Sequence, residues 1–288
     1  MGRPFKGMGD FYIPAAKLKS TLGGTVSTLD TETLQKLLGG VTAAEVEAEL
    51  AADRERFDGA AEVADALRRS VRLGLALRRW IERGKLAAFT FNFLDMRKSA
   101  GHLTVPFLEA SKAMARGTGY AGEGDVLTAL LVGAVAAGNE QTTFTEMFCP
   151  NWEDGTVYLS HMGEVNWRLL EGRGLLREMD YKYSATDNPA LVTGRFRPGE
   201  IVLVNLAPVT ESGYRLILAP ATMLPVTGTD KMEGSVRGWF RPRLALPDFL
   251  SAYSRLGGTH HLAMTYAEST ETLETFARLS GWETVVIQ

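Results

Sequence analysis

The spacing of apolar positions divides the chain into a helix-rich first part and a strand-rich second part. Between residues 42 and 83, apolar residues recur every four positions among arginines and acids. That period keeps them on one face of a helix; the members are Val63, Leu67, Val71 and Leu75. The pattern Thr42-x-x-Glu45 is a capping box, which marks a helix start. The segment is therefore predicted to form a pair of amphipathic helices.

The residues after this pair predict a buried strand. Gly84 is expected to end the preceding helix, because glycine readily adopts the left-handed conformation found there. Residues 87–93 are too few for a stable helix and are largely apolar at both odd and even positions. Such a run is typical of a parallel strand that is covered on both faces. A helix followed by a buried strand indicates an α/β arrangement.

A second helix and a glycine-rich turn complete the first predicted domain. The helix is expected at residues 106–116, and the turn occupies residues 117–124. Asp125 can then cap a helix of small residues that ends near Gly138. Residues 1–138 are accordingly predicted to form an α/β domain, with helices around a short sheet.

After Gly138, prolines and glycines separate short runs rich in Val, Leu, Ile, Thr and Tyr. This spacing is expected of an antiparallel sandwich or barrel. The predicted strands are residues 191–196, 200–206, 214–218, 222–226 and a closing strand at 284–287, with helices at 247–256 and 270–279 flanking residues 259–266. The fold class is therefore α/β plus β, with residues 139–288 forming an antiparallel β-barrel-like domain with late helices.

Composition argues against several classes of function. The 288 residues are 45% hydrophobic and 23% charged, the balance of a folded chain. Lys plus Arg number 31 and Asp plus Glu 34, a net charge of −3, so no nucleic-acid partner is expected. A single cysteine, Cys149, closes no intrachain disulfide. The longest uncharged stretches, such as residues 126–139, are shorter than a membrane span. The expectation is a cytoplasmic protein with no membrane partner.

Five acidic and histidine residues stand out as candidates for chemistry. The chain has four histidines, of which His161, His260 and His261 lie at apparent strand edges in the second part. Glu123 lies between two glycines, where a bulky acid has no packing reason to be, and Glu146 interrupts a strand-like run. A carboxylate inside a strand needs water or a partner.

Glu123, Glu146, His161 and one member of the pair His260–His261 would together supply two oxygen and two nitrogen ligands. Long sequence separations mean that only folding could bring them together. A set without thiolates suits Mn²⁺, Co²⁺, Mg²⁺ or Fe²⁺ with open positions for substrate, better than it suits a structural zinc. The set therefore indicates a catalytic metal.

Simpler interpretations exist for the same residues. A glutamate in a glycine turn is often a solvated loop acid, and a glutamate in a strand often points outward from an edge. Adjacent histidines in a strand point to opposite faces, so at most one would be directed into a site.

Other kinds of active site have weaker support in the sequence. Ser160-His161 lacks the G-x-S-x-G motif of a serine nucleophile, and Cys149 has no neighbouring base to activate it. The glycines of residues 117–122 lack the βαβ context of a dinucleotide-binding site.

Five short blocks follow one another along the chain in a recognisable order: AFTFNFLD at residues 88–95, GYAGEGD at 119–125, TFTE at 143–146, SHMGEVN at 160–166 and GGTHH at 257–261. Together they resemble the L-arabinose isomerase family of metal-dependent aldose–ketose isomerases. The resemblance implies a divalent-metal site, usually Mn²⁺, with Co²⁺ or Mg²⁺ as alternatives. Its ligands would be Glu123, Glu146, His161 and His261.

The resemblance also implies a reaction and its residues. The family interconverts L-arabinose and L-ribulose, often with D-galactose and D-tagatose, by proton transfer between C1 and C2 through an enediol. Glu123 and Glu146 would be the catalytic pair that moves the proton. His260 would contact a substrate hydroxyl, and Phe93 and Met8 would form apolar walls of the sugar site. A homo-oligomer is expected, as in the family.

The chain also departs from the family. Members of the family have three domains and nearly twice this length. The resemblance therefore implies a short form that lacks the N-terminal domain and is expected to begin near the family's second domain. In residues 144–149 (FTEMFC), the part that follows Glu146 differs from the family's usual aromatic and acidic sequence. The alternatives left open are a different sugar substrate, or a metal- and sugar-binding module or subunit that requires a separate N-terminal-domain partner for activity.

Overall fold

The structure is a computed structural model that describes residues 4–10, 12–210 and 213–288. The helices in these ranges are α1 (Ala15–Leu22), α2 (Thr31–Gly39), α3 (Ala43–Arg56), α4 (Ala64–Gly84), α5 (Phe107–Met114), α6 (Val126–Gly138), α7 (Leu246–Arg255) and α8 (Glu271–Leu279). Short 3₁₀ turns lie at η1 (Phe93–Asp95), η2 (Lys98–Ala100) and η3 (Trp167–Leu169). None of the described helices is both long enough and apolar enough to cross a bilayer.

The predicted amphipathic helix pair is confirmed as α3 and α4. Thr42 caps α3: its hydroxyl accepts from the Glu45 amide at 3.3 Å, and its own amide donates to the Glu45 carboxylate at 2.8 Å. The expected stop at Gly84 is wrong by one residue. Gly84 is still helical, and Lys85 takes the left-handed conformation with φ 48°.

The predicted parallel strand after the helix pair is confirmed in shorter form, although only Phe89 of its three residues is buried. β1 (Ala88–Thr90) pairs in parallel with β2 (Gly119–Ala121) to form a two-stranded sheet. The chain leaves the sheet after Thr90, and Phe93 begins η1 instead of continuing the strand. The helix of small residues is confirmed as α6, and Asp125 caps it by accepting from the Thr128 amide at 2.9 Å.

The remaining strands form one nine-stranded sheet in the order β11-β8-β7-β10-β3-β4-β9-β6-β5. Their bounds are β3 (Thr142–Asn151), β4 (Thr156–Ser160), β5 (Leu175–Glu178), β6 (Ala190–Arg195), β7 (Gly199–Pro208), β8 (Tyr214–Met223), β9 (Val236–Pro242), β10 (His261–Tyr266) and β11 (Glu283–Val286). The late helices predicted at 247–256 and 270–279 are confirmed as α7 and α8.

The expectation of a purely antiparallel sheet is wrong. β11 runs parallel to β8, and β6 runs parallel to β9, so the sheet is mixed. The two strands predicted at 214–218 and 222–226 are one continuous strand, β8, which pairs with β7 along its whole length. β8 also pairs with β9. Barrel-like closure of this sheet stays a prediction, as does the division of the chain at residue 138.

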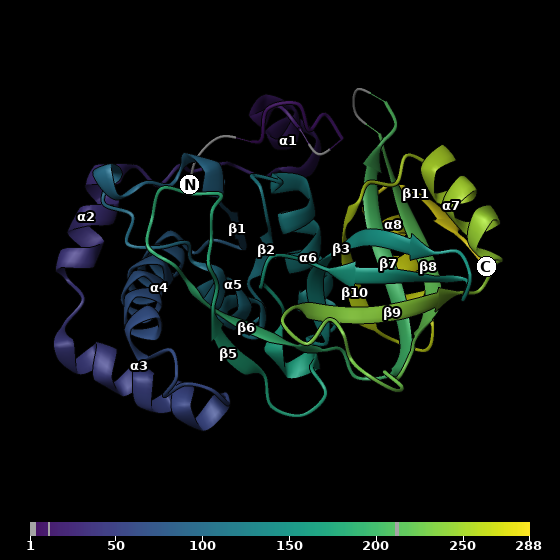
Figure 1. Cartoon of the computed structure of the whole chain (residues 1–288). Helices are drawn as coiled ribbons and strands as arrows, with labels where there is room; N and C mark the ends of the chain where they lie inside the picture. Colours follow the sequence, from purple (N-terminus) through teal and green to yellow (C-terminus); the bar gives the residue numbers. More distant parts are fainter. Residues whose placement is uncertain (1–3, 11, 211–212) are drawn as a thin grey trace.

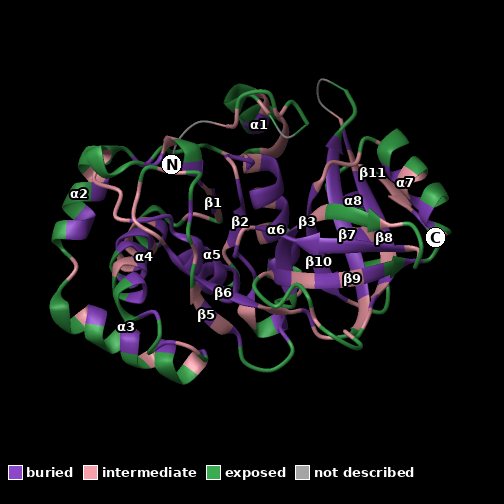
Figure 2. Cartoon of the chain, in the orientation of Figure 1, coloured by how far each residue is buried: buried purple, intermediate pink, exposed green. Residues whose placement is uncertain are grey.

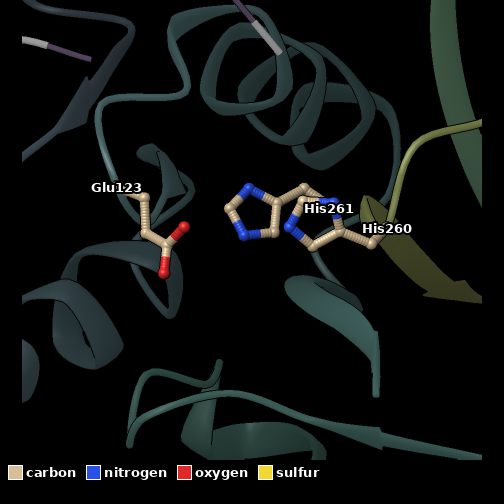
Figure 3. Close-up of side chains that lie close together, drawn as sticks. All are labelled: Glu123, His260 and His261. Atoms are coloured by element: carbon tan, nitrogen blue, oxygen red, sulfur yellow. The ribbon is translucent and has the colours of Figure 1, made fainter. Parts of the chain in front are cut away.

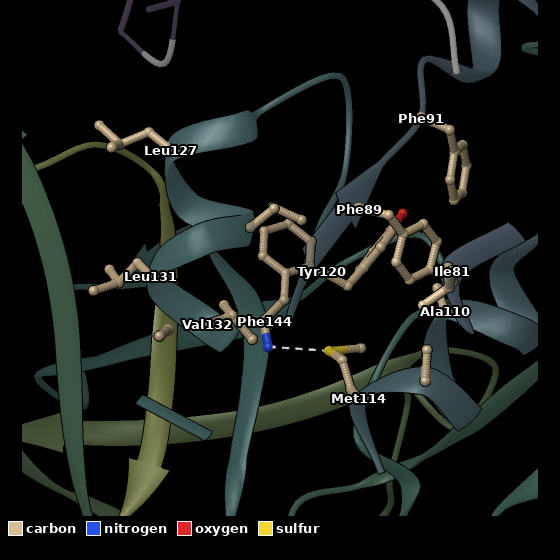
Figure 4. Packing of buried hydrophobic residues seen from close by; sticks show 14 of the residues in the cluster. Ile81, Phe89, Phe91, Ala110, Met114, Tyr120, Leu127, Leu131, Val132 and Phe144 are labelled. Atoms are coloured by element: carbon tan, nitrogen blue, oxygen red, sulfur yellow. Dashed lines mark hydrogen bonds between the residues drawn. The ribbon is translucent and has the colours of Figure 1, made fainter. Parts of the chain in front are cut away.

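Helix α6 lies between the two sheets and joins their cores. It packs against β1 and β2 on one side and against β3, β7 and β10 on the other (Figure 1). Tyr120 of β2 and Phe144 of β3 meet edge to face, with ring centroids 5.7 Å apart. The Phe144 amide also donates to the Met114 sulfur at 3.3 Å (Figure 4). Figure 2 shows buried residues concentrated along α6 and the central strands. The junction between the sheets is therefore buried and closely packed.

Candidate metal centre

The loop between β2 and α6 presents Glu123 in an unusual backbone conformation. Its φ is 63°, a left-handed value that side-chain-bearing residues rarely adopt. The Phe5 amide donates to the Glu123 carbonyl at 3.2 Å, and the Gly124 amide donates to the Thr90 hydroxyl at 3.1 Å. Gly122 admits the neighbouring imidazole, because a Cβ there would lie 2.6 Å from Cε1 of His161. Strain held in place by such contacts is characteristic of functional sites.

Three adjacent strands bring the next candidates together. In the register of the sheet, His261 of β10 lies directly opposite Glu146 of β3, and Glu146 lies opposite Ser160, the last residue of β4. Directly opposed residues have Cβ atoms about 5 Å apart, and His161 follows Ser160. One ligand atom from each of Glu146, His161 and His261 lies within 4.8 Å of the others. Antiparallel pairing thus assembles residues that are up to 115 positions apart (261 − 146 = 115).

A second group shares His261. Ligand atoms of Glu123, His260 and His261 also lie within 4.8 Å of one another, and Figure 3 shows both imidazoles beside the Glu123 carboxylate. The expectation that at most one of the adjacent histidines is directed into the site is wrong. β10 begins at His261, so the alternation of strand side chains does not apply to His260. The two ring centroids are 4.5 Å apart.

Buried carboxylates fix the orientation of two of the imidazoles. Nδ1 of His161 hydrogen-bonds to Glu164 at 2.7 Å, and the Tyr120 hydroxyl donates to the other Glu164 oxygen at 2.5 Å. Nδ1 of His261 hydrogen-bonds to Asp125 at 3.1 Å. A carboxylate on Nδ1 directs Nε2 to a metal, the arrangement that supports many metal-bound histidines.

These supporting residues were not predicted as functional. Glu164 falls in the SHMGEVN block and Asp125 in the GEGD block, where Asp125 was expected only to cap a helix. The available signal was their place beside the ligand candidates: Glu164 is three residues after His161, and Asp125 is two residues after Glu123.

The donor atoms fit a divalent cation. With metal–ligand bonds of about 2.1 Å, neighbouring ligand atoms in an octahedron are about 3 Å apart and opposite ones about 4 Å apart. Atoms that already lie within 4.8 Å reach those separations with small side-chain movements. Oε2 of Glu123 is buried and has no hydrogen-bond partner among the described residues. A buried carboxylate oxygen without a donor needs a positive partner.

Burial shifts the ionisation of the site. It raises the pKa of both Glu123 and Glu146, and the nearby His161 only partly offsets this. Burial also raises the pKa of Asp125, to about 7. The pKa of His261 is held well below its usual value, first by burial and then by His161, so this ring is neutral and able to bind a metal.

The pKa of His161 shifts in the opposite direction to that of His261. Burial lowers its pKa, but the carboxylates of Glu164, Glu146 and Glu123 together outweigh burial, and the net shift is upward. A proton therefore competes with a metal for this ring more strongly than it does for His261.

The two residues expected to form apolar walls of a sugar site, Phe93 and Met8, differ in burial. Phe93 is buried in an aromatic cluster, with Phe5, Phe107 and Tyr181 each edge-on to its ring. The Phe5 amide contacts the Glu123 carbonyl, so this cluster adjoins the Glu123 loop. Met8 is half-buried in the segment before α1. A substrate contact for Phe93, Met8 or His260 stays a prediction.

Comparison with known protein families identifies the relatives of this chain. The family model described as L-arabinose isomerase central domain matches residues 15–140, and the one described as L-arabinose isomerase C-terminal domain matches residues 141–283. The chain belongs to the L-arabinose isomerase family. Its two consecutive matches carry every residue of the two candidate ligand groups.

Individual L-arabinose isomerases agree with this assignment. The protein of that name from Geobacillus kaustophilus is 31% identical over 231 residues, which cover 78% of this chain and 45% of the relative. The Anoxybacillus flavithermus protein is 32% identical, and the match covers 81% of this chain and 46% of the relative. The Acidothermus cellulolyticus protein is 30% identical, and the match covers 92% of this chain and 55% of the relative. The chain thus spans about half the length of these curated relatives.

Proposed function

We propose that this chain carries the catalytic centre of a metal-dependent aldose–ketose isomerase that interconverts L-arabinose and L-ribulose. The observation that carries the proposal is the convergence of Glu146 of β3, His261 of β10 and His161, which directly follows β4, with Glu123 against the shared histidine. Relatives of the chain are named L-arabinose isomerase. Activity on D-galactose, giving D-tagatose, is part of the same proposal.

The proposed cofactor is Mn²⁺, with Co²⁺ or Mg²⁺ as substitutes. Glu146, His161 and His261 would hold it, with Glu123 as the fourth ligand. When bound, such a cation polarises the carbonyl and hydroxyl oxygens of the sugar. Glu164 and Asp125 keep the two imidazoles oriented, since each accepts from a ring Nδ1.

Glu123 and Glu146 are the proposed proton carriers. One carboxylate takes the proton from C2, beside the carbonyl carbon C1 of the aldose, and returns it to C1 of the enediol. The other carboxylate moves the hydroxyl proton from O2 to O1, so that the carbonyl passes from C1 to C2. Burial raises the pKa of both groups, which brings their proton affinity closer to neutral pH and favours both steps. His260 is proposed to hold a substrate hydroxyl, and the buried ring of Phe93, with Met8, to bound the sugar.

A second candidate function follows from how little of its relatives the chain covers. Because it spans about half of its relatives, it can be a metal- and sugar-binding module, or a subunit that needs a separate N-terminal-domain partner for turnover. We also propose a homo-oligomer and a cytoplasmic location, the latter because Cys149 is exposed and forms no disulfide.

The test is ketose formation by the purified chain after chelation, with and without Mn²⁺, on L-arabinose and D-galactose side by side. We expect Mn²⁺ to restore turnover and Glu146→Gln to lower it by at least about 10³-fold, because the variant loses a proposed proton carrier and a proposed metal ligand at once. Glu140→Gln is the matched control, because Glu140 is an exposed acid just before the same strand. Mn²⁺ binding without any ketose from either sugar would favour the binding module.

A further inference from the structure

Residues 4–10, which we name the N-terminal strap, connect two parts of the candidate site. At one end the Phe5 amide donates to the Glu123 carbonyl at 3.2 Å, and the Phe5 ring meets Phe93 edge to face at 4.9 Å. At the other end the Asp10 carboxylate lies 2.7 Å from Nδ1 of His260. The strap therefore reaches from the Glu123 loop to the residue that precedes β10.

The Asp10 contact favours one tautomer of His260. A carboxylate accepts from an Nδ1–H group, which leaves the lone pair on Nε2. An imidazole that has lost this partner is free to carry its proton on Nε2 instead and to rotate. His260 lies with Glu123 and His261 in one candidate group, so its tautomer decides whether it accepts or donates there.

The three imidazoles of the site share this arrangement but differ in burial. Each has a carboxylate on Nδ1: Glu164 for His161, Asp125 for His261 and Asp10 for His260. The first two pairs are almost fully buried, whereas the side chains of Asp10 and His260 are 38% and 27% exposed. A partly exposed ion pair contributes little to folding stability. We therefore expect the Asp10–His260 pair to affect the orientation of the His260 ring and not the stability of the fold.

We propose that Asp10 is a positioning residue, which holds His260 as the Nδ1–H tautomer so that Nε2 faces Glu123 and an incoming sugar hydroxyl. The proposal rests on the proposed isomerase function for its effect on turnover, but not for its effect on the ring. The strap supplies the carboxylate from 250 positions away in the sequence, so the orientation of His260 depends on the strap being docked.

The tautomer is measured directly by long-range ¹H–¹⁵N NMR of the imidazoles in metal-free protein. The chain has four histidines, so the His260 signals are identified by their loss in His260→Gln. We expect the Nδ1–H form in the wild type and a shift toward the Nε2–H form in Asp10→Ala. The matched control is Asp58→Asn, an exposed acid that pairs with Arg173 at 3.3 Å elsewhere on the chain. A His260 tautomer that is unchanged in Asp10→Ala would overturn the proposal.

Kinetics give the second readout. Asp10→Ala is expected to lower kcat/KM about 10-fold or more, the usual cost of removing a carboxylate behind a site histidine, with Mn²⁺ affinity and thermal midpoint unchanged. It should add no further loss to His260→Gln, since both changes remove the same contact. An additive loss, or a fall in the thermal midpoint that matches the loss of activity, would indicate a structural role instead. An inactive wild type whose His260 tautomer still responds to Asp10→Ala would refute turnover by the chain alone and leave the positioning role standing.

Discussion

At the scale of single residues, the candidate centre depends on groups that do not themselves reach a cation. Glu164 receives two donors, Nδ1 of His161 and the Tyr120 hydroxyl, and no part of its side chain is exposed. Because both of its oxygens are engaged, Glu164 fixes the ring without competing for a metal. The orientation of His161 is therefore set before any cation arrives.

Replacing Glu164 by glutamine should weaken Mn²⁺ binding 10–100-fold, the usual effect of losing such a partner. Glutamine presents an NH₂ group to one of the two donors that the carboxylate accepts, so one hydrogen bond is lost and the ring is released. Isothermal titration with Mn²⁺ measures the change, and circular dichroism checks the fold. Affinity equal to that of the wild type would show that His161 does not need this support.

The sequence predicts the candidate ligands better than their supports. Glu123 and Glu146 stand out because an acid in a glycine turn or a strand lacks a packing reason, and both fall in the candidate groups. Asp10 gives no such signal, because its role depends on a contact with His260 that only the tertiary structure creates. That both His260 and His261 approach Glu123 also has no local signal, since the start of β10 at His261 is a matter of pairing and not of local pattern.

At the scale of elements, the closeness of β2 to α6 sets the position of the Glu123 loop. A Cβ on Gly119 would lie 2.2 Å from the carbonyl oxygen of Ala129 and 2.6 Å from the amide nitrogen of Gly133. Both obstacles are backbone atoms of α6, so the helix would have to move away from the sheet. Glycine at this position lets the strand and the helix approach.

Gly119→Ala should therefore destabilise the fold by about 3 kcal/mol, at the upper end of the usual cost of overpacking. Gly138→Ala is the matched control: Gly138 ends the same helix, nothing lies within 4 Å of its added Cβ, and alanine there should be neutral or stabilising by up to about 1 kcal/mol. Urea unfolding midpoints compare the two. Equal midpoints would mean that the strand and the helix are not so tightly packed.

Helices were more predictable than strand pairing. The capping box at Thr42 and the four-residue period are local signals, and α3 and α4 follow them. The parallel pairing of β11 with β8 has no local signal, because it depends on where α8 returns the chain to the sheet. Pro220 suggested a break between two strands, but β8 runs through it without interruption.

At the scale of the whole molecule, the candidate centre joins the two sheets. Glu123 comes from the loop that leaves the small parallel sheet, whereas Glu146, His161 and His261 come from the nine-stranded sheet, with α6 between them (Figure 1). A cation bound by both sets would cross-link the two parts and stabilise the native chain, because a ligand that binds only the folded form raises its stability.

The most direct test of the proposed centre counts the Mn²⁺ ions bound by the purified chain, from the loss of the free-ion signal in electron paramagnetic resonance. We predict one tightly bound ion per wild-type chain, and none at the same concentration in Glu146→Gln or His161→Gln, each checked for an intact fold. Ions bound equally well by the wild type and both variants would place the metal elsewhere and contradict the account.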